Sequence, residues 1–450
     1  MHGVKREKKT PASIQARQAR KEKEHQKIHA YLDIEQRFFQ LRDQGIKTKD
    51  ALAHTTHLLT LNPELYTAWN YRRDILLALF QAPLDEQPQQ KPDVFASLRQ
   101  PTDAPPSTES PTASSSAPDP NPNLAPTAPT PGTSAAPAAT DEDQDKQRKQ
   151  QRTRLLVERD LELTEHALRA HPKVYWIWNH RMWCLENLPE DPDLLARGFN
   201  KWKIEMKLVD KMLELDPRNF HGWTYRRYLT AQLAATFLPS AAVTASPPPV
   251  ADVESFPASL SRSDLPAEAR QAQLELAQSE LQYTLRKIEA NISNFSAWHQ
   301  RTKLLPPIWD AKGWDEDQRR KARDQEYELV KQAMYTDPAD QSVWIYHRWL
   351  VEQDPAASIL VREIEAIEEL LDLEPDSKWC MHTLAHYKTL LIDARKKAQD
   401  DEAASASAAQ VDDEEKRLRD QVKQLLEKLI DVDPDRANRY RDLLEGRAHF

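Results

Sequence analysis

The sequence predicts an all-α fold, an α-solenoid of helix pairs with disordered inserts, on the basis of three observations. The chain has 450 residues with only 7 Gly, and its frequent Leu, Ala, Glu and Lys favour helix over sheet. Only 39% of the residues are hydrophobic and 32 are Pro, which is typical of a folded part diluted by disordered segments. A Trp-containing motif also recurs, 45 or 46 residues apart where no insert intervenes, which indicates an array of repeated helix pairs.

The repeated motif is most complete in HPKVYWIWNHRMW, which begins at His171. Its strong copies begin at Asn62, His171, Asp216, Asn291 and Asp337, and its weaker copies at Glu374 and Asp433. In the strong copies a Trp lies six residues after a Pro, or after Ile292 in the fourth copy. Because the residue before Pro leaves the helical region and Pro suits the first helical position, one helix is expected to end there and a second to begin.

The Trp of each strong copy and the Arg that follows it are predicted to be structural. Residues three apart share a face of a helix. A residue that recurs in every unit is expected to have a structural role that all units share. The Trp is expected to fill the space between hairpins, and the Arg to bind helix-end carbonyls or acidic groups of a neighbour. In the fifth copy His347 takes the place three residues after the Trp, and the Arg follows it. The predicted structural residues are Trp69, Arg72, Trp178, Arg181, Trp223, Arg226, Trp298, Arg301, Trp344 and Arg348.

Three segments of low complexity divide the repeats. They are rich in Pro, Ser, Thr and Ala and have few apolar residues, so they are predicted to be disordered inserts. The predicted order is a basic N-terminus with the first repeat (1–86), a Pro/Ser/Thr/Ala-rich insert (87–145), repeats two and three (146–237), a second insert (238–268), repeats four to six (269–397), an acidic Ala/Ser insert (398–415) and terminal capping helices (416–450).

Two consecutive repeats carry a cation where the others do not. The residue after the Pro is Lys173 in the second repeat and Arg218 in the third, whereas it is acidic or neutral in the other five. The helix dipole disfavours a cation near a helix N-terminus. Two adjacent helix N-termini that carry cations predict an anion site, and a diphosphate would suit it. Tyr175 and His221 lie on the same two turns, and ordinary solvated surface charge is the alternative interpretation.

Composition and motifs exclude several other classes of protein. The two Cys rule out a disulfide framework and favour a reducing, cytoplasmic compartment. No apolar run has the length of a membrane helix, and no apolar secretory signal is visible. A net charge of −9 gives no support to nucleic-acid binding. Because no phosphate loop, nucleophile motif or metal-ligand cluster is present, no metal site is expected in this chain, and any catalytic role would need a partner.

The repeat Pro-x-x-aromatic-x-x-Trp-x-x-Arg resembles that of protein prenyltransferase α subunits. The resemblance implies a right-handed superhelix of antiparallel helix pairs around a β subunit, which holds the catalytic zinc and most of the isoprenoid pocket. It implies catalytic roles for Lys173 and Tyr175, which lie in the matching Pro-Lys-x-Tyr-x-x-Trp segment. It also places Asn219 and His221 at the isoprenoid diphosphate. Arg218, which the charge pattern indicates, is predicted to bind the same group.

The basic start MHGVKREKK and the first repeat resemble the Rab-type branch of this family. Members that read a C-terminal CaaX box carry Gln after the Tyr of this motif, whereas this chain has Trp176. The resemblance therefore implies transfer of geranylgeranyl from its diphosphate to C-terminal Cys of Rab GTPases, presented by an escort protein. Two alternatives stay open: the α subunit shared by farnesyltransferase and type I geranylgeranyltransferase, and a non-enzymatic helical-repeat adaptor.

Overall fold

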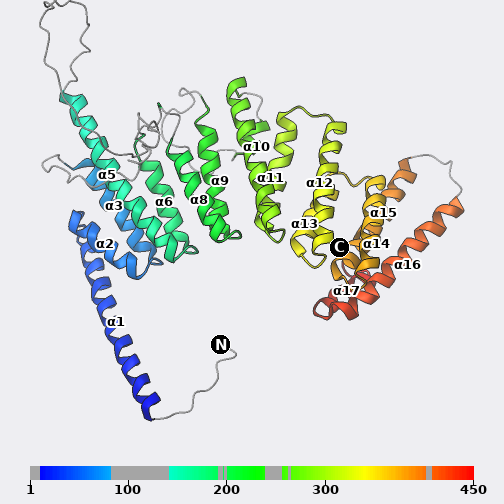
Figure 1. Cartoon of the computed structure of the whole chain (residues 1–450), viewed down its shortest axis with the longest axis horizontal. Helices are drawn as coiled ribbons and strands as arrows, with labels where there is room; N and C mark the ends of the chain where they lie inside the picture. Colours follow the sequence, from blue (N-terminus) through cyan, green and yellow to red (C-terminus); the bar gives the residue numbers. More distant parts are fainter. Residues whose placement is uncertain are drawn as a thin grey trace, which may run out of the picture. The chain divides into compact units, whose positions relative to one another are not determined.

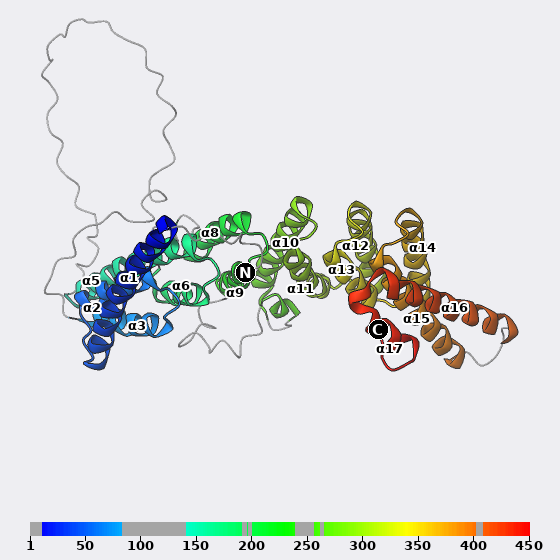
Figure 2. The ribbon, with the colours of Figure 1, turned by 90° about the horizontal axis from the view of Figure 1, so that it is seen from below.

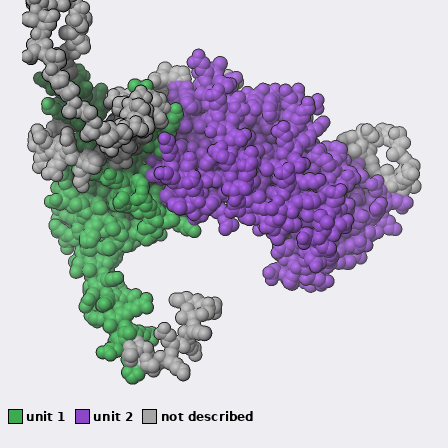
Figure 3. All heavy atoms as spheres, in the orientation of Figure 1, with its two compact units in different colours: residues 1–204 green, residues 205–450 purple. Residues whose placement is uncertain are grey.

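Helices make up all of the regular structure in the part of the chain that is described. The computed structural model describes residues 11–82, 141–190, 196, 200–238, 256–261, 265–401 and 408–450. Every element assigned there is an α-helix or a short 3-10 helix, which confirms the predicted all-α class (Figure 1). None of the helices in these ranges is long and apolar enough to cross a membrane. The chain divides into two compact units, residues 1–204 and 205–450 (Figure 3).

The first unit contains two helix pairs and a long leading helix. Its helices are α1 (Pro11–Asp43), α2 (Lys49–Leu61), α3 (Tyr66–Gln81), α5 (Asp141–Ala170) and α6 (Tyr175–Asn187). The C-terminal part of α1 packs on α2 through buried Phe38 and Leu41, whereas its N-terminal part extends away from the pair (Figure 1). The α2–α3 and α5–α6 pairs pack through α3 and α5, so consecutive repeats share one core.

The second unit continues the same succession of pairs, and α8 begins in the last residues of the first unit. Its elements are α8 (Lys201–Leu215), α9 (Phe220–Ala235), η2 (Ala258–Ser261), α10 (Ala267–Ala290), α11 (Phe295–Ala311), α12 (Glu316–Thr336), α13 (Gln341–Glu352), α14 (Ala357–Leu373), α15 (Lys378–Asp401), α16 (Ala408–Val432), η3 (Pro434–Arg436) and α17 (Ala437–Leu444). Figure 2 shows the first helices of three pairs (α10, α12 and α14) along one side and their second helices (α11, α13 and α15) along the other.

In three pairs of the second unit the turn forms where the sequence predicts it, and a short polar side chain caps the second helix. Asn219, Asn294 and Asp340 are the N-caps of α9, α11 and α13, and each side chain accepts a hydrogen bond from a backbone N–H of the first turn. The ends of α1 and α11 are followed by Gly45 and Gly313, at φ 66° and 63°. Only glycine adopts this left-handed conformation without strain, so both helices end there.

The predicted inserts differ from the structure at their edges. Helix α5 already begins at Asp141, α15 continues to Asp401 and α16 begins at Ala408, so the ends of the sequence assigned to the first and third inserts are partly helical. The second insert contains η2 and the turn just before it, and Phe256 of the turn and Leu260 of η2 are buried against α9, α10 and α11. These apolar side chains join a hydrophobic core, which a compositional reading of the whole segment overlooks. The central parts of the inserts and the basic residues 1–10 lie outside the described ranges.

Removing the Phe256 ring should therefore weaken the second unit. The side chain is 8% exposed, so Phe256→Ala is expected to lower the free energy of unfolding by about 3 kcal/mol through lost burial and a cavity. Urea unfolding followed by circular dichroism measures the loss. The matched control is Phe220→Ala, because Phe220 is 65% exposed. Equal effects of the two substitutions would show that Phe256 adds nothing to the core.

Candidate functional site

The Trp of each strong repeat ties the turn to the second helix. In all five copies the indole nitrogen donates a hydrogen bond to the backbone carbonyl six residues earlier, at 2.7–2.9 Å. The pairs are Trp69 with Pro63, Trp178 with Pro172, Trp223 with Pro217, Trp298 with Ile292 and Trp344 with Pro338. The fourth repeat keeps this bond without a Pro because the acceptor is a backbone oxygen, which any residue supplies.

The Arg three residues after the Trp joins one repeat to the next. Arg72 donates two hydrogen bonds to Asp160 on α5, at 2.7 and 2.6 Å. Arg301 binds Glu326 in the same two-pronged way, at 2.5 and 2.6 Å. The same Arg side chains also donate to a backbone carbonyl of the first helix in their own pair, as Arg72 does to Leu52 at 2.9 Å. A planar guanidinium with five donors can serve both neighbours at once.

Arg226 and Arg181 each show part of this arrangement, whereas Arg348 does not. Arg226 binds Glu280 through two hydrogen bonds of 2.7 Å, and Arg181 donates to the Leu161 carbonyl at 2.7 Å. The prediction for Arg348 is wrong, because its side chain is 40% exposed and pairs with Glu352 of its own helix at 3.1 Å. Fully buried His347 takes the inward position and binds Glu363 at 2.9 Å. One residue turns a side chain by about 100° around a helix, which directs the Arg to the surface.

The acidic partners of these Arg residues were not predicted, although the sequence contains a signal for them. Asp160 also accepts a hydrogen bond from His180, and Glu326 accepts one from Tyr346, at 2.8 and 2.6 Å. In both cases the second donor lies 20 residues after the acid. Glu205 and Tyr225 have the same separation and a 2.9 Å bond. An alignment of the repeats on their Trp would therefore have shown an acid at a constant position in the first helices of repeats two to five.

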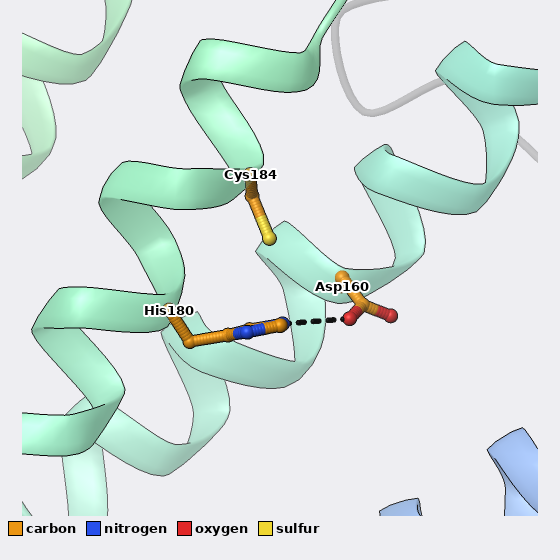
Figure 4. Close-up of side chains that lie close together, drawn as sticks. All are labelled: Asp160, His180 and Cys184. Carbon is orange, nitrogen blue, oxygen red and sulfur yellow. Dashed lines mark hydrogen bonds and ion pairs between the residues drawn. The ribbon is translucent and has the colours of Figure 1, made fainter. Parts of the chain in front are cut away.

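Three residues of the second pair lie close enough together to raise the question of a metal site. The ligand atoms of Asp160, His180 and Cys184 lie within 4.8 Å of one another (Figure 4). Burial would raise the pKa of Asp160, but Arg72 and His180 outweigh it and lower that pKa to about 2. Burial raises the pKa of the Cys184 thiol well above its usual value, so the thiol stays protonated.

This donor set does not fit a metal ion. Both oxygens of Asp160 already accept hydrogen bonds, from the Arg72 guanidinium and from His180. A metal ligand must be a thiolate, a neutral imidazole or an available carboxylate, and Cys184 and Asp160 meet neither requirement. The cluster is therefore part of the bonding between repeats. It is the only such cluster among the residues that the structure describes.

The predicted diphosphate contacts of the first unit lie together at the start of α6. Lys173 is exposed in the turn, and Tyr175, the first residue of the helix, is 53% exposed. Trp176 packs between Tyr175 and Tyr66 of the preceding repeat, with ring centroids 5.5 and 5.3 Å away. No side chain caps this helix, since its N-cap is Val174. The turn thus presents one cation and one phenol at an N-terminus that has no side-chain cap.

The predicted contacts of the second unit lie at the start of α9, and one of them has a different position from that expected. Arg218 is exposed in the turn, and His221 is half-buried with its ring 3.9 Å from that of Phe220. Asn219 is only 4% exposed, and its Oδ1 accepts hydrogen bonds from the His221 and Gly222 backbone N–H groups at 3.0 and 3.3 Å. Asn219 therefore holds the first turn of α9 in place beneath His221.

The comparisons with known proteins agree with this arrangement of repeats. The family model "Protein prenyltransferase alpha subunit repeat" matches residues 48–79, 157–188, 202–233, 277–306 and 323–354, which contain the five strong copies. One relative, from Schizosaccharomyces pombe, is 30% identical over 465 residues, covering 99% of this chain and 98% of its own length. The chain belongs to the protein prenyltransferase α-subunit family.

Within this family, the relatives have a more specific name. The Schizosaccharomyces pombe protein is a geranylgeranyl transferase type-2 subunit alpha. A protein of the same name from Candida albicans is 26% identical, covering 99% of this chain and 98% of its own length. Among solved structures, Candida albicans protein geranylgeranyltransferase-I complexed with GGPP aligns at a TM-score of 0.49 and 17% identity, covering 92% of this chain and 89% of that one.

Proposed function

We propose that this chain is the α subunit of a type-2 geranylgeranyl transferase that acts in the cytoplasm. With a β subunit, it would transfer geranylgeranyl from geranylgeranyl diphosphate to C-terminal Cys of Rab GTPases presented by an escort protein. The observation that supports this most is the similarity to fungal type-2 α subunits over nearly the whole length of both chains. The five matched repeats, with their Trp and Arg bonds, support the role of a scaffold for that partner.

The start of α6 would contribute cationic and hydrogen-bonding groups to the reaction. Geranylgeranyl transfer forms a bond between the Cys sulfur and carbon 1 of the isoprenoid and releases diphosphate, on which negative charge builds up. Lys173 and Tyr175 would bind that diphosphate, since cations and donors at a helix N-terminus stabilise developing anionic charge. Zinc bound by the β subunit would lower the pKa of the substrate thiol.

The start of α9 would contribute in the same way from the second unit. Arg218 and His221 are accessible at this helix N-terminus and would contact an isoprenoid diphosphate. Asn219 would act through His221, because its side chain caps the helix on which the imidazole lies. This division of roles assigns substrate contact to the accessible residues and positioning to the buried one.

Replacing Lys173 tests the proposal directly. In the reconstituted heterodimer, Lys173→Ala is expected to lower kcat by about 10- to 100-fold, because it removes one charge that stabilises the leaving diphosphate. The affinity for the β subunit and the thermal midpoint should stay unchanged. Lys321→Ala serves as the control, since Lys321 is an exposed residue of α12. Unchanged turnover of the Lys173→Ala enzyme would overturn the assignment of this residue.

The choice of β subunit separates the alternatives. A type-2 β subunit that yields an active Rab-prenylating enzyme supports the proposal. Activity on a CaaX peptide with a farnesyltransferase or type I β subunit would support the shared α subunit instead. Trp176, which packs against Tyr66 and Tyr175, provides no amide for a CaaX carboxylate and so favours the type-2 enzyme. Failure to bind any prenyltransferase β subunit would leave the helical-repeat adaptor.

A further inference from the structure

Two histidines lie one helical turn apart on the exposed part of α1. His25 and His29 are both exposed, as is every residue from 14 to 30, and this part of the helix extends away from α2 (Figure 1). Residues four apart lie on the same face of a helix. The two imidazole rings are neighbours for this reason, with their centroids 4.6 Å apart and their planes at 67°.

The ring nitrogens of this pair form no other polar contact in the described ranges. Neither imidazole takes part in a hydrogen bond or an ion pair there. His54 of α2 differs, since its ring bonds to the Ile34 carbonyl at 2.8 Å. A histidine binds a metal through a neutral imidazole, and solvated imidazoles are largely neutral above pH 7. The pair thus meets the requirement that the buried cluster of the second repeat does not.

The charges on the same face of α1 favour a cation. The charged residues three or four positions from either histidine are Lys21, Glu22 and Asp33. An ion at the pair would therefore meet two carboxylates and one ammonium group. Like charges at these distances repel and opposite charges attract, so the balance favours a positive ion.

The ligand type selects the class of ion. Imidazole nitrogen suits Zn²⁺, Cu²⁺ and Ni²⁺, whereas Mg²⁺ and Ca²⁺ prefer oxygen ligands. Two imidazoles four residues apart are also the ligand pair of helical zinc motifs. No metal site is expected from the sequence, because a third ligand at the spacing of such motifs is lacking. Water would complete the coordination of an ion that two histidines hold.

We propose that His25 and His29 together bind a divalent first-row transition-metal ion, and that this ion stabilises the exposed part of α1. A helix without tertiary contacts is only marginally stable in water. An ion held by residues four apart links two successive turns. Because it binds the helical segment and not the unfolded one, it shifts the equilibrium towards the helix. This inference does not depend on the proposed function, since neither a β subunit nor a prenyl substrate takes part.

Calorimetric titration of the metal-free, full-length chain with Ni²⁺ at pH 7.5 tests the pair. We expect a Kd of about 100 μM or tighter, since Ni²⁺ stands high in the affinity order of nitrogen sites. His25→Gln/His29→Gln should raise the Kd by about tenfold or more, because even the outer partners of metal ligands contribute about 10- to 100-fold. The matched control is His57→Gln/His166→Gln, at exposed positions of α2 and α5, which should leave the Kd unchanged.

A spacing variant separates the pair from the number of histidines. Lys27→His/His29→Gln keeps that number, but residues two apart lie about 200° apart around a helix, so the variant should lose the binding. Hydrogen exchange gives a second readout. At a Zn²⁺ concentration of about ten times its Kd, the backbone amides of residues 21–33 should exchange about tenfold more slowly.

Three results would each overturn the proposal. A Kd above about 1 mM for the unaltered chain would show an adventitious ion only. Equal affinity of the spacing variant and the unaltered chain would show that the arrangement of His25 and His29 is not responsible. Unchanged hydrogen exchange of α1 at saturating Zn²⁺ would show that the ion does not stabilise the helix.

Discussion

Asp160→Asn is expected to lower the free energy of unfolding by about 3–5 kcal/mol, because it removes the charge that compensates buried Arg72. Arg72 and Asp160 have side chains only 4% and 1% exposed, and their oxygen–nitrogen distance is 2.6 Å. The substitution keeps the shape of the side chain, so the loss reports the charge rather than a cavity. It also removes the carboxylate from the hydrogen bond with His180. Urea unfolding at neutral pH measures the change.

A matched substitution on the same helix gives the control. Glu165 pairs with Arg169 at 2.5 Å, but these side chains are 35% and 64% exposed. Glu165→Gln should therefore change the free energy of unfolding by less than about 1 kcal/mol, as exposed ion pairs do. A loss for Asp160→Asn as small as that of Glu165→Gln would show that the Arg–acid bonds do not hold the repeats together.

The fold class could be predicted because the signal for it is local. The Trp indole and its carbonyl acceptor lie six residues apart in every strong copy, so the motif and the bond recur together. The positions of the pair turns follow from the same short segments, in which Pro or a capping Asn or Asp separates the helices. The burial of Phe256, inside the second predicted insert, was less predictable. Its side chain packs with residues of α9, α10 and α11 that only tertiary packing brings together.

The partners of the Arg residues illustrate what a single pass along the sequence misses. Arg72 and Asp160 are 88 residues apart, with the first insert between them. Which acid meets which Arg depends on how one repeat stacks on the next, and periodicity alone does not contain that information. Arg348 shows the same limit at a smaller scale, because a shift of one position reversed whether the side chain faces inward or outward.

Among the candidate diphosphate residues, Lys173 and Arg218 were predicted from charge at helix N-termini, whereas Asn219 came from the family resemblance. Their substrate role stays a prediction. The structure places Lys173 with Tyr175 at the start of α6, and Arg218 with His221 at the start of α9. Asn219 shows why residue type alone was insufficient, since an Asn can bind a ligand or cap a helix with the same oxygen. Only the burial of Asn219 and its two backbone hydrogen bonds distinguish these roles.

Acidification from pH 7 towards pH 4 is expected to destabilise the chain through buried histidines. Burial lowers the pKa of His180 to about 4, although Asp160 opposes this shift. Burial and Arg348 lower the pKa of His386 to about 3, and burial with Arg436, Arg348 and Arg439 lowers that of His382 to about 4. Unfolded histidines titrate near pH 6.5, so between these values the unfolded chain binds more protons than the folded chain. Stability is therefore full above pH 6.5 and falls as the pH drops.

Asp160 contributes only in a lower and separate pH window. Its folded pKa of about 2 lies below the usual value of 3.8, so its stabilisation is present above pH 3.8 and is lost as the pH falls towards 2. The loss between pH 6.5 and about pH 5 thus belongs to the histidines, and Glu363, whose pKa lies below the usual 4.5, adds to it only at lower pH. Each histidine that binds a proton only when unfolded adds a slope of at most about 1.4 kcal/mol per pH unit.

A substitution of His386 should isolate one of these contributions. Its side chain is 7% exposed and stacks on the Phe450 ring, with the centroids 5.2 Å apart. His386→Gln cannot bind the proton, so the slope of unfolding free energy against pH between about 6 and 4.5 should decrease by about 1 kcal/mol per pH unit. Using the slope separates the titration from any loss of packing at neutral pH. His166→Gln, at an exposed position of α5, is the matched control for the same change of side chain. If His386→Gln has the slope of the unaltered chain, burial does not keep this imidazole neutral, and the acid sensitivity must have another origin.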